Sequence, residues 1–396
     1  MTFNPGQNAL MPTYKKWPVT FVSGSGSYLI DTAGKKYLDF LSGIAVCSLG
    51  HCHPKVTEAL VDQANTLWHV SNLFGNEIAP KVAHELDLLI RSGYVDTPGK
   101  VFFTNSGAEA NECAFKLARL FGGRRRHVVL SAYGSFHGRT LATLHATGQP
   151  EKHEPFWPLP EGFSHIAFND FQALENAIRG EVAALIIEPT QGEGGVVVPE
   201  PGYLRQVRKI CSEMGILMIA DEVQTGLGRM GTWFRCHVED VVPDIVTVAK
   251  SLGNGMPIGA CWARAEIADL FSPGDHGSTF GGQPLATSAA LATLAELKAI
   301  DAPRRALQYG KILRDNLAGL DGVLDISGDG LLLGVKVGSN SAPKVAENAL
   351  EKGLIVNPVR PDVIRMAPPL NISESEIAEA VSRFSESLKE SLAENG

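Results

Sequence analysis

Short apolar runs that alternate with helical patterns constrain the fold of this chain more than any other feature of its sequence. Strands are expected at 101–104, 128–130, 182–188, 216–223 and 245–249, and helices at 108–121 and 203–214. Because several of these strands are apolar throughout, both faces of their sheet must be covered. Strands separated by helices therefore predict an α/β fold with a mostly parallel central sheet.

The two ends of the chain have a different pattern. Residues 19–40 predict a small hairpin with its turn at Thr32-Ala33-Gly34. From about Asp301 onward we expect a helix, a glycine-broken strand pair and two more helices with one strand between them. The sequence thus predicts a large domain of residues 56–295 and a smaller α+β domain built from residues 1–55 and 296–396.

Composition excludes several classes of protein. Of 396 residues 44% are hydrophobic and 20% charged, which supplies an ample core. The net charge of −8 and a single short basic run at 124–126 argue against nucleic-acid binding. No apolar run reaches the ~18 residues of a membrane span, and the N-terminus lacks the layout of a signal peptide. Six cysteines without a C-x-x-C pair predict reduced thiols in a cytoplasmic protein.

Polar residues stand at the ends of three expected strands. Glu188 closes one, Asp221 closes the next, and Lys250 follows the third. Because ligands of open α/β sheets bind beyond the carboxyl ends of strands, we expect two carboxylates and an amine at one edge. Residues 104–107 follow a fourth strand and open a helix, whose N–H groups and dipole favour a phosphate.

A lysine beside a phosphate cradle can bind the phosphate or form a Schiff base. The Walker pattern is absent, and Gly24-Ser25-Gly26 lacks the third glycine of a nicotinamide fingerprint. A cradle, a strand-end lysine and an acid for an aromatic nitrogen are together typical of pyridoxal phosphate. Taken singly, Lys250 could be an exposed lysine and Asp221 a turn acid or a helix cap.

Here the sequence resembles the class (subgroup) III aminotransferases, pyridoxal-phosphate enzymes of fold type I. The resemblance rests on nine stretches in order: GIAVCSLGHCHP, SNLF, NSGAEANECAFKLAR, SFHGRT, EPTQGEGGVVVP, DEVQTGLGR, AKSLGNGMPIGA, GDHGSTFGG and VIRMAPPL. They cover most of the chain. The resemblance implies pyridoxal 5'-phosphate as cofactor and a homodimer with shared active sites.

The resemblance also implies roles in the cofactor site. Lys250 would be the Schiff-base lysine and proton carrier, and Asp221 the partner of the pyridine nitrogen. Phe136 and Val223 would cover the ring, and Gln224 would bind its hydroxyl oxygen. The implied phosphate-binding residues are Ser106, Gly107, Ala108 and, from the other subunit, Thr279. His137 and Glu188 are open between a supporting role and an ordinary structural one.

Other residues bear on the substrate. By resemblance, Arg139 grips the carboxylate at the far end of the ω-amino donor, and Arg365 binds the α-carboxylate of glutamate or 2-oxoglutarate. Glu193 covers Arg365 when the donor is bound, because an uncovered arginine would be a buried unpaired charge. Tyr28 resembles a residue at the donor's α-amino or carboxylate end. Candidates for the entrance are Ile44, Asn72 and Phe74, with core packing the alternative for Phe74.

Some positions depart from the family or suggest other chemistry. Ala108, Asn254 and Gln283 stand where the family more often has threonine, glycine and asparagine, and we expect any consequence in cofactor affinity. His51-Cys52-His53 has the order of a zinc cluster. No second ligand pair accompanies it, so a structural turn before a helix at Lys55 is favoured.

The implied reaction transfers the δ-amino group of N-acetyl-L-ornithine to 2-oxoglutarate, as in arginine biosynthesis. Ile44 favours this acyl donor, because ornithine enzymes tend to have tyrosine there. The same chemistry on succinylornithine, N-succinyl-diaminopimelate, ornithine or 4-aminobutyrate stays open. A racemase or aminomutase is disfavoured by Glu193 with Arg365. A cofactor-binding regulator is disfavoured because no implied catalytic position is lost.

Overall fold

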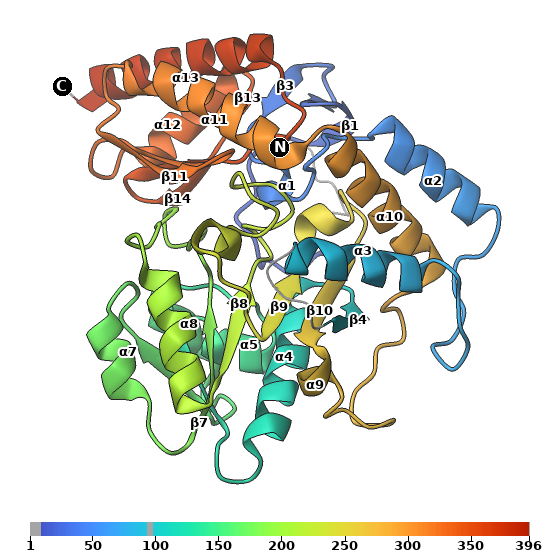
Figure 1. Cartoon of the computed structure of the whole chain (residues 1–396). Coiled ribbons are helices and arrows are strands. Elements are labelled where there is room, and N and C mark those ends of the chain that lie inside the picture. The colour runs from blue at the N-terminus through green and yellow to red at the C-terminus, as the bar shows by residue number, and fades with distance from the viewer. Residues whose placement is uncertain (1–8, 93–97, 396) are drawn as a thin grey trace.

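A seven-stranded sheet forms the centre of the molecule (Figure 1). The computed structural model describes residues 9–92 and 98–395. In spatial order the strands are β4 (Gly99–Thr104), β10 (Gly259–Arg264), β9 (Ile245–Val248), β8 (Leu217–Asp221), β7 (Val182–Ile187), β5 (Val128–Ala132) and β6 (Phe163–Ile166). Strand β10 pairs antiparallel with β4 and β9, and the other pairs of this sheet are parallel, so the expected mostly parallel α/β sheet is confirmed.

The apolar runs of the sequence are explained by helices on both faces of this sheet. Along β7, Ala184 and Ile186 pack in the cluster under α4 (Gly107–Gly122), whereas Leu185 and Ile187 pack in the cluster under α8 (Tyr203–Met214). A strand whose two faces are both covered has no position for alternate polar residues. Strands β6 and β10 were not expected, because "FSHI" is half polar and "GACWAR" begins and ends on residues typical of loops.

Two smaller sheets are formed by the ends of the chain. One has the order β1 (Phe21–Ser25), β2 (Tyr28–Asp31), β3 (Lys36–Asp39) and β13 (Leu354–Ile355), and the other β11 (Asp325–Asp329), β12 (Leu332–Lys336), β15 (Val363–Met366) and β14 (Asn357–Arg360). Parallel pairing of Leu38 with Leu354 joins N-terminal and C-terminal segments. In Figure 1 the blue N-terminal strands accordingly lie beside the orange and red C-terminal elements.

The sequence expectation for these ends was incomplete in two ways. The hairpin of residues 19–40 is a three-stranded meander, because Gly26 with φ of +56° makes a turn additional to the one after Asp31. Three short strands, not one, lie between α12 (Ala342–Glu351) and α13 (Glu374–Asn395). Strands of two to four residues give too short a pattern to be recognised.

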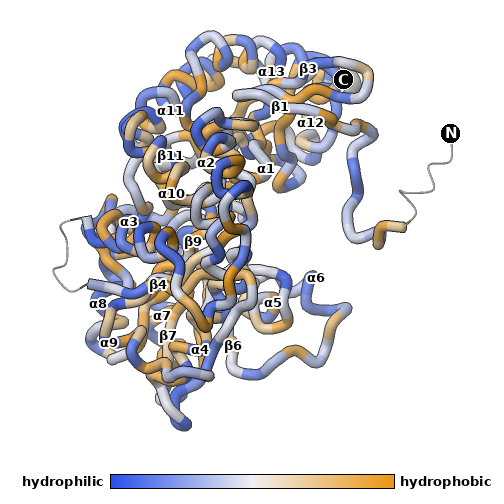
Figure 2. The backbone as a smooth tube through the Cα atoms, turned by 90° about the vertical axis from the view of Figure 1, so that its right-hand side faces the viewer, coloured by the Kyte–Doolittle hydropathy of each residue, from blue (hydrophilic) through white to orange (hydrophobic). Residues whose placement is uncertain are grey.

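The remaining helices surround these sheets. They are α1 (Ser42–Ala45), α2 (Pro54–Ala64), α3 (Ala79–Arg91), α5 (Leu141–Ala146), α6 (Pro150–His153), α7 (Phe171–Ala177), α9 (Ala265–Ala268), α10 (Pro284–Ala299) and α11 (Ala302–Ala318), with 3₁₀ turns η2 (Glu154–Phe156), η3 (Arg235–Glu239) and η4 (Lys250–Leu252). Figure 2 shows apolar strands in the interior and an N-terminal segment that extends away from the body. The predicted domain boundaries fall inside α2 and α10 and stay a prediction.

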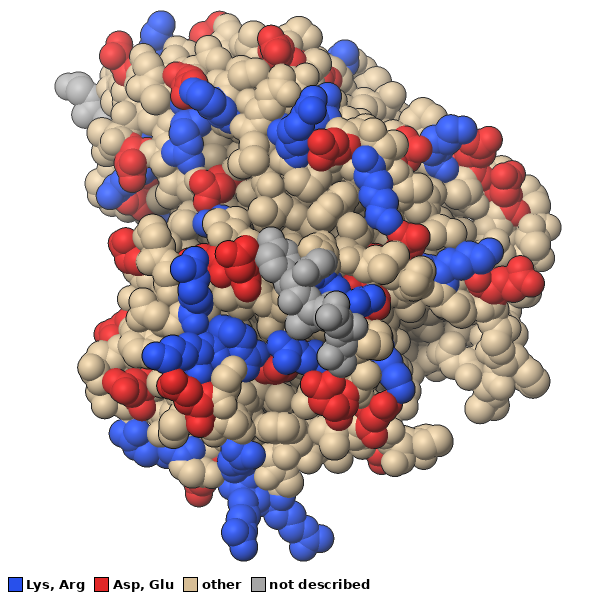
Figure 3. Space-filling view, in the orientation of Figure 1, with Lys and Arg blue, Asp and Glu red and all other residues tan. Residues whose placement is uncertain are grey.

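Charge is mixed on the surface. Figure 3 shows Lys and Arg interspersed with Asp and Glu over most of the visible face, as the composition leads one to expect. None of the described helices combines the length and the low polarity that crossing a membrane requires.

The segment α1 is a left-handed turn. Ser42, Gly43, Ile44 and Ala45 have φ of 50°, 66°, 67° and 60°, and for a β-branched residue such as Ile44 this conformation is strained. Hydrogen bonds hold the turn in place: Asp39 Oδ1 accepts from the N–H of Ser42 at 2.8 Å, and Ser251 Oγ donates to the carbonyl of Ala45 at 3.1 Å. Since Ser251 follows Lys250, the turn is fastened to the end of β9.

Candidate active site

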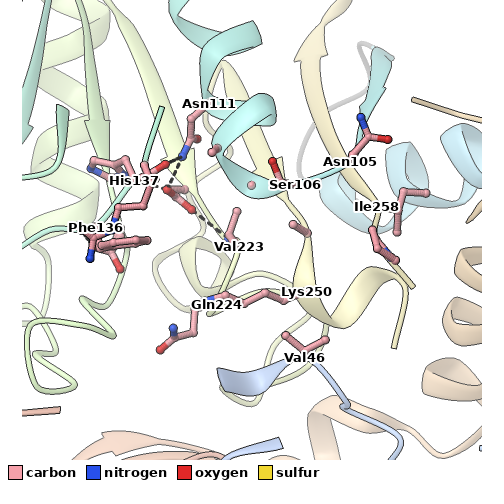
Figure 4. Close-up of a pocket in the computed structure, with 18 of the residues that line it drawn as sticks. Val46, Asn105, Ser106, Asn111, Phe136, His137, Val223, Gln224, Lys250 and Ile258 are labelled. Atoms are coloured by element: carbon pink, nitrogen blue, oxygen red, sulfur yellow. Dashed lines mark hydrogen bonds and ion pairs between the residues drawn. The ribbon is translucent and has the colours of Figure 1, made fainter. Parts of the chain in front are cut away.

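A cavity of about 380 Å³ opens at the carboxyl ends of β7, β8 and β9 (Figure 4). Its lining brings together the expected polar residues of the sheet edge with the start of α4. The lining residues with expected roles are Ser106, Gly107, Ala108, Phe136, His137, Arg139, Glu188, Asp221, Val223, Gln224 and Lys250. Eleven positions spread between residues 106 and 250 thus meet in one place.

The start of α4 forms an anion cradle. Ser106 is its N-cap, and its Oγ accepts from the N–H of Glu109 at 3.2 Å. Glu109 Oε2 accepts in return from the N–H of Asn105 at 2.7 Å, so the two residues fix the first turn. The first N–H groups of a helix have no intrahelical partner and attract negative charge. Gly107 is required, because a Cβ there would lie 2.9 Å from Val223 Cγ2.

Asp221 lies at the centre of a buried hydrogen-bond cluster. Its side chain is at the end of β8 and Asp221 is only 4% exposed. Its Oδ2 accepts from Asn111 Nδ2 and from His137 Nδ1, both at 2.8 Å. Because a carboxylate only accepts, Nδ1 of His137 carries the proton. The other oxygen, Oδ1, accepts from the N–H of Val223 at 3.2 Å. This carboxylate faces a cavity and retains an acceptor position for a ligand.

Sequence reasoning missed Asn111. It lies on the inner face of α4 among buried residues such as Ala110, Cys113 and Ala114. A polar residue on the buried face of a helix was the available signal, since such residues need a partner. Here the partners are Asp221 and the carbonyl of His137 at 2.8 Å.

Lys250 begins η4 directly after β9, with φ of +44°. In the view of Figure 4 its side chain runs between Val223 and Val46. Burial and, to a smaller extent, the Arg365 guanidinium lower the pKa of Lys250 from 10.5 to about 8, against the opposing charges of Glu193, Asp221 and Glu188. About a tenth of this amine is therefore neutral, and hence nucleophilic, at pH 7, against fewer than about one in a thousand for a lysine with the ordinary pKa of 10.5.

Glu188 connects the segments on either side of the cavity. Its Oε1 accepts from the N–H of Phe136 at 2.8 Å and its Oε2 from the N–H of Gly192 at 3.2 Å. Burial raises the pKa of Glu188 to about 7, against the effect of these donors. Glu188 thus lines the cavity and fixes the backbone on either side of it, and its part in the chemistry stays a prediction.

Arg365 forms a second polar cluster beside Gln224. It lies on β15, is 1% exposed, and donates from Nη1 to Glu193 Oε1 at 2.7 Å and to Gln224 Oε1 at 3.2 Å. Nη2 donates to Asn357 Oδ1 at 2.8 Å, and Nε has no partner among the described residues. Burial opposes ionisation of Glu193, but Arg365 outweighs it and holds the pKa of this carboxyl below its ordinary value.

Arg139 lies at the exposed side of the cavity. Its Cζ is 5.4 Å from the centroid of the Phe136 ring, a distance typical of a cation–π contact. An exposed guanidinium at this place can bind an anionic group without the desolvation cost of a buried charge.

Other predicted residues do not line this cavity within the chain. The Tyr28 hydroxyl donates to Glu379 Oε2 on α13 at 2.8 Å. Asn72 Nδ2 donates to the carbonyls of Ser278 and Gly281, and thereby holds the loop that carries Thr279. Asn72 and Thr279 line a separate hollow of about 780 Å³. Phe74 is 70% exposed, which excludes the core-packing alternative.

The departures from the family pattern have structural explanations. Asn254 has φ of +45°, a conformation that asparagine tolerates, and its side chain bonds the backbone of Leu49 and Gly50. Gln283 accepts from the N–H of Val70 at 2.8 Å. Neither residue lines the cavity, so their expected effect on cofactor affinity stays a prediction.

His51 belongs to a turn, as the sequence favoured. Its Nε2 lies 2.8 Å from Asp39 Oδ2. Burial opposes protonation, but the hydrogen bonds to Asp39 and Cys47 outweigh it and raise the pKa of His51 to about 10. Helix α2 begins at Pro54. Within residues 9–92 and 98–395 no group of three or more potential ligands could hold a metal ion.

Comparisons with known proteins agree with this geometry. A family model described as aminotransferase class-III matches residues 10–388. The chain is 46% identical over 389 residues to the acetylornithine aminotransferase of Caldanaerobacter subterraneus, covering 96% of this chain and 97% of that protein. It is 46% identical over 383 residues to the acetylornithine aminotransferase of Methanopyrus kandleri, covering 96% and 97%.

Solved structures are similar over nearly the whole chain. The ornithine aminotransferase of Toxoplasma gondii, which has pyridoxal phosphate at partial occupancy in its active site, superposes with a TM-score of 0.92 at 35% identity, covering 98% of this chain and 94% of that one. The N-acetylornithine aminotransferase of Stenotrophomonas maltophilia gives 0.84 at 35% identity, covering 96% and 98%.

Proposed function

This chain belongs to the class-III aminotransferases, and from that premise we propose that it transfers the δ-amino group of N-acetyl-L-ornithine to 2-oxoglutarate. The products are N-acetyl-L-glutamate 5-semialdehyde and L-glutamate. The observation that carries the proposal within the chain is the Glu193–Arg365 ion pair next to the cavity that contains Lys250. The donor identity is supported by relatives of 46% identity that span almost the whole chain.

The family uses pyridoxal phosphate, and the cavity suits this group. The start of α4 provides N–H donors for a phosphate, and a Cβ at Gly107 would collide with Val223, which lines the same cavity. Asp221 offers an acceptor for a protonated ring nitrogen, and Phe136 and Val223 offer apolar surfaces for the ring. We assign Ser106, Gly107 and Ala108 to the phosphate. When bound, the cofactor supplies an aldehyde for the amino group and a ring that withdraws electrons from the substrate carbon.

Lys250 is the residue that we assign to covalent binding and proton transfer. Its lowered pKa of about 8 gives a neutral amine that can accept a proton and an ammonium that can return it. Lys250 begins η4 and lines the cavity together with Val223 and Val46.

The ion pair of Arg365 and Glu193 allows the substrate site to present either a neutralised or a free guanidinium. With the pair closed, Arg365 is neutralised, which suits a donor carbon that carries no carboxylate. With Glu193 displaced, the guanidinium is free to bind the α-carboxylate of 2-oxoglutarate through paired donors, one of them the unpartnered Nε. Glu193 is 31% exposed on its side chain, so water can replace Arg365 as its partner.

Arg139, Tyr28 and Thr279 complete the assignment. The exposed Arg139 is assigned to the far carboxylate of the donor. Tyr28 and Thr279 lie away from this cavity in their own chain, which is consistent with a homodimer in which one subunit supplies residues to the other. Ile44 leaves space for an acyl group near Val46. The alternative donors succinylornithine, N-succinyl-diaminopimelate, ornithine and 4-aminobutyrate are distinguished from N-acetylornithine by adding each of them separately in the same spectroscopic assay.

The test is a visible absorption spectrum of the protein with pyridoxal phosphate, before and after addition of N-acetylornithine without an oxo acid. We expect a band of bound cofactor that the donor converts and that 2-oxoglutarate restores. Lys250→Ala should abolish turnover, whereas the exposed Lys209→Ala should behave as wild type. A band that responds to 4-aminobutyrate or ornithine but not to N-acetylornithine would overturn the donor, and unchanged turnover in Lys250→Ala would overturn the mechanism.

A further inference from the structure

The buried cluster around Asp221 is more extensive than binding a ring nitrogen needs. Its Oδ2 accepts two side-chain donors at 2.8 Å, whereas Oδ1 accepts a single backbone N–H at 3.2 Å. The two oxygens of one carboxylate are therefore unequal. Oδ2 is saturated by the protein, and Oδ1 keeps acceptor capacity.

Asn111 has only one orientation in this cluster. On one side of its amide lie two groups that can only accept, Asp221 Oδ2 and the carbonyl of His137, each 2.8 Å from Nδ2. On the other side the Thr247 hydroxyl donates to Asn111 Oδ1 at 2.8 Å. Asn111 and Thr247 are both fully buried, so water does not compete for these bonds. A flipped amide would lose both bonds to Asp221 and His137 and would place its own oxygen against two acceptor oxygens.

These contacts tie together the elements that surround the cavity. Asn111 is one turn along α4 from the anion cradle, and Thr247 lies on β9 three positions before Lys250. Asp221 ends β8, and His137 follows Phe136 (Figure 4). The carbonyl of Thr247 also accepts from the N–H of Glu222 at 3.0 Å. One amide side chain thus sets the position of the acid relative to the cradle and the lysine.

We propose that Asn111, oriented by Thr247, is a positioning residue that fixes Asp221 so that Oδ1 is kept for the cofactor. The inference rests on the proposed function. Asn111 donates a hydrogen bond to an ionised group, and thereby stabilises the carboxylate form that a protonated ring nitrogen requires. It acts through Asp221 and needs no contact with the reacting atoms.

The test compares apoproteins that differ at these positions. Asn111→Ala should weaken the affinity for pyridoxal phosphate by roughly tenfold to a hundredfold, since a hydrogen bond to a charged group is lost. It should also move the pH at which the visible band of the bound cofactor changes, because the ring nitrogen loses part of its counter-charge. The matched control is Asn348→Ala, which removes a buried amide bonded to the carbonyl of Ser387 on the far side of the molecule.

A second pair of variants guards against a folding defect in Asn111→Ala. Thr247→Val keeps the shape of the side chain and removes the hydroxyl, so it should weaken cofactor affinity several-fold. Thr247→Ser keeps the hydroxyl and should bind the cofactor as wild type does. Thermal unfolding of each apoprotein reports the structural cost separately. Unchanged affinity and spectrum in Asn111→Ala and Thr247→Val, or an equal loss in Asn348→Ala, would overturn the proposal. Failure of wild type to bind the cofactor would instead overturn the proposed function.

Discussion

The two polar clusters of the site, around Asp221 and around Arg365, are built on opposite principles. In the Asp221 cluster the side chains that form the hydrogen bonds, those of Asn111, His137 and Thr247, are all buried. They belong to helix α4, to the segment after β5 and to strand β9. In the Arg365 cluster the guanidinium is buried, but its charged partner Glu193 is 31% exposed and lies on a connection without regular structure.

The difference follows from what each cluster must do. A carboxylate that keeps one ligand through every turnover is best held by buried donors. Such donors do not leave it, because a buried donor without a partner costs free energy. A group that must bind a carboxylate in one half of the reaction and none in the other needs a partner that water can solvate. Gln224 lies between the fixed cluster around Asp221 and the exchangeable cluster around Arg365, because it lines the cavity and accepts a hydrogen bond from Arg365.

The largest effect should come from Asp221→Asn, which breaks the fixed cluster. The amide loses the charge, and because its oxygen has to face Asn111 and His137, its NH2 group faces the N–H of Val223 and the ligand; cofactor affinity should therefore fall roughly a hundredfold to ten-thousandfold. Absorbance titration of the apoprotein measures it. Asp244→Asn is the control, because Asp244 is a buried acid at the opposite edge of the sheet, bonded to Arg208 and the N–H of Met218. Equal losses of affinity in both variants would contradict the comparison.

The exchangeable cluster should separate the two half-reactions. Arg365→Met should slow the reaction with 2-oxoglutarate roughly a hundredfold, since paired charged hydrogen bonds are lost, and slow the donor half-reaction by less than about tenfold. Single-turnover absorbance measures each half. The control is Arg360→Met: Nε of Arg360 donates to the carbonyl of Gly194 at 3.2 Å, and its loss should affect both halves alike. A uniform loss in Arg365→Met would show that the cluster is structural.

The pH dependence of Lys250 links the clusters, because both contribute charge to it. Burial and Arg365 lower the pKa of this amine to about 8 from 10.5, so uptake of pyridoxal phosphate by the apoprotein should accelerate as pH rises through about 8. In Arg365→Met the midpoint should move to higher pH. Stopped-flow absorbance measures the rate, with N-α-acetyl-lysine as a reference. A midpoint at the ordinary value in wild type would contradict the assigned environment.

The smallest effect should be on stability in acid. The folded-state pKa of Glu193 is lowered, so its contribution to stability is present above the ordinary value of 4.5 and is lost as pH falls through the folded value. The stability difference between wild type and Glu193→Gln should therefore be constant near neutral pH and shrink in acid. Denaturant unfolding across this range checks it, with the exposed Glu161→Gln as control. A difference that grows in acid would reverse the sign of the argument.

Much of the fold could be predicted because buried residues recur along the sequence with the period of the helix or strand to which they belong. Helix α8 begins and ends at the expected residues, since Gly202 and Gly215 delimit it. Strand β10 could not be predicted, because antiparallel pairing with β4 and β9 is decided by residues more than a hundred positions away or across a loop. The three strands after α12 were missed for lack of length rather than lack of pattern.

The site divides in the same way. Lys250, Asp221 and Ser106 stand at element ends, where sequence position alone predicts a common edge. Asn111 and Thr247 lie inside a helix and a strand, and only tertiary contact gives their side chains a partner. Gln224 was expected to bind the cofactor ring, and its contact with Arg365 could not be read from spacing.

The antiparallel strand β10 has a consequence for how the protein is made. Strand β4, which leads into the anion cradle, pairs with β10 and with no other described strand, and a Cβ at Gly259 would lie 2.5 Å from the carbonyl oxygen of Ser106. During translation this ladder, which fixes the cradle against the sheet, therefore cannot be completed before residue 264 has left the ribosome. Arg365 emerges later still. Capture of the cofactor is accordingly a late step of biogenesis, which follows assembly of most of the central sheet.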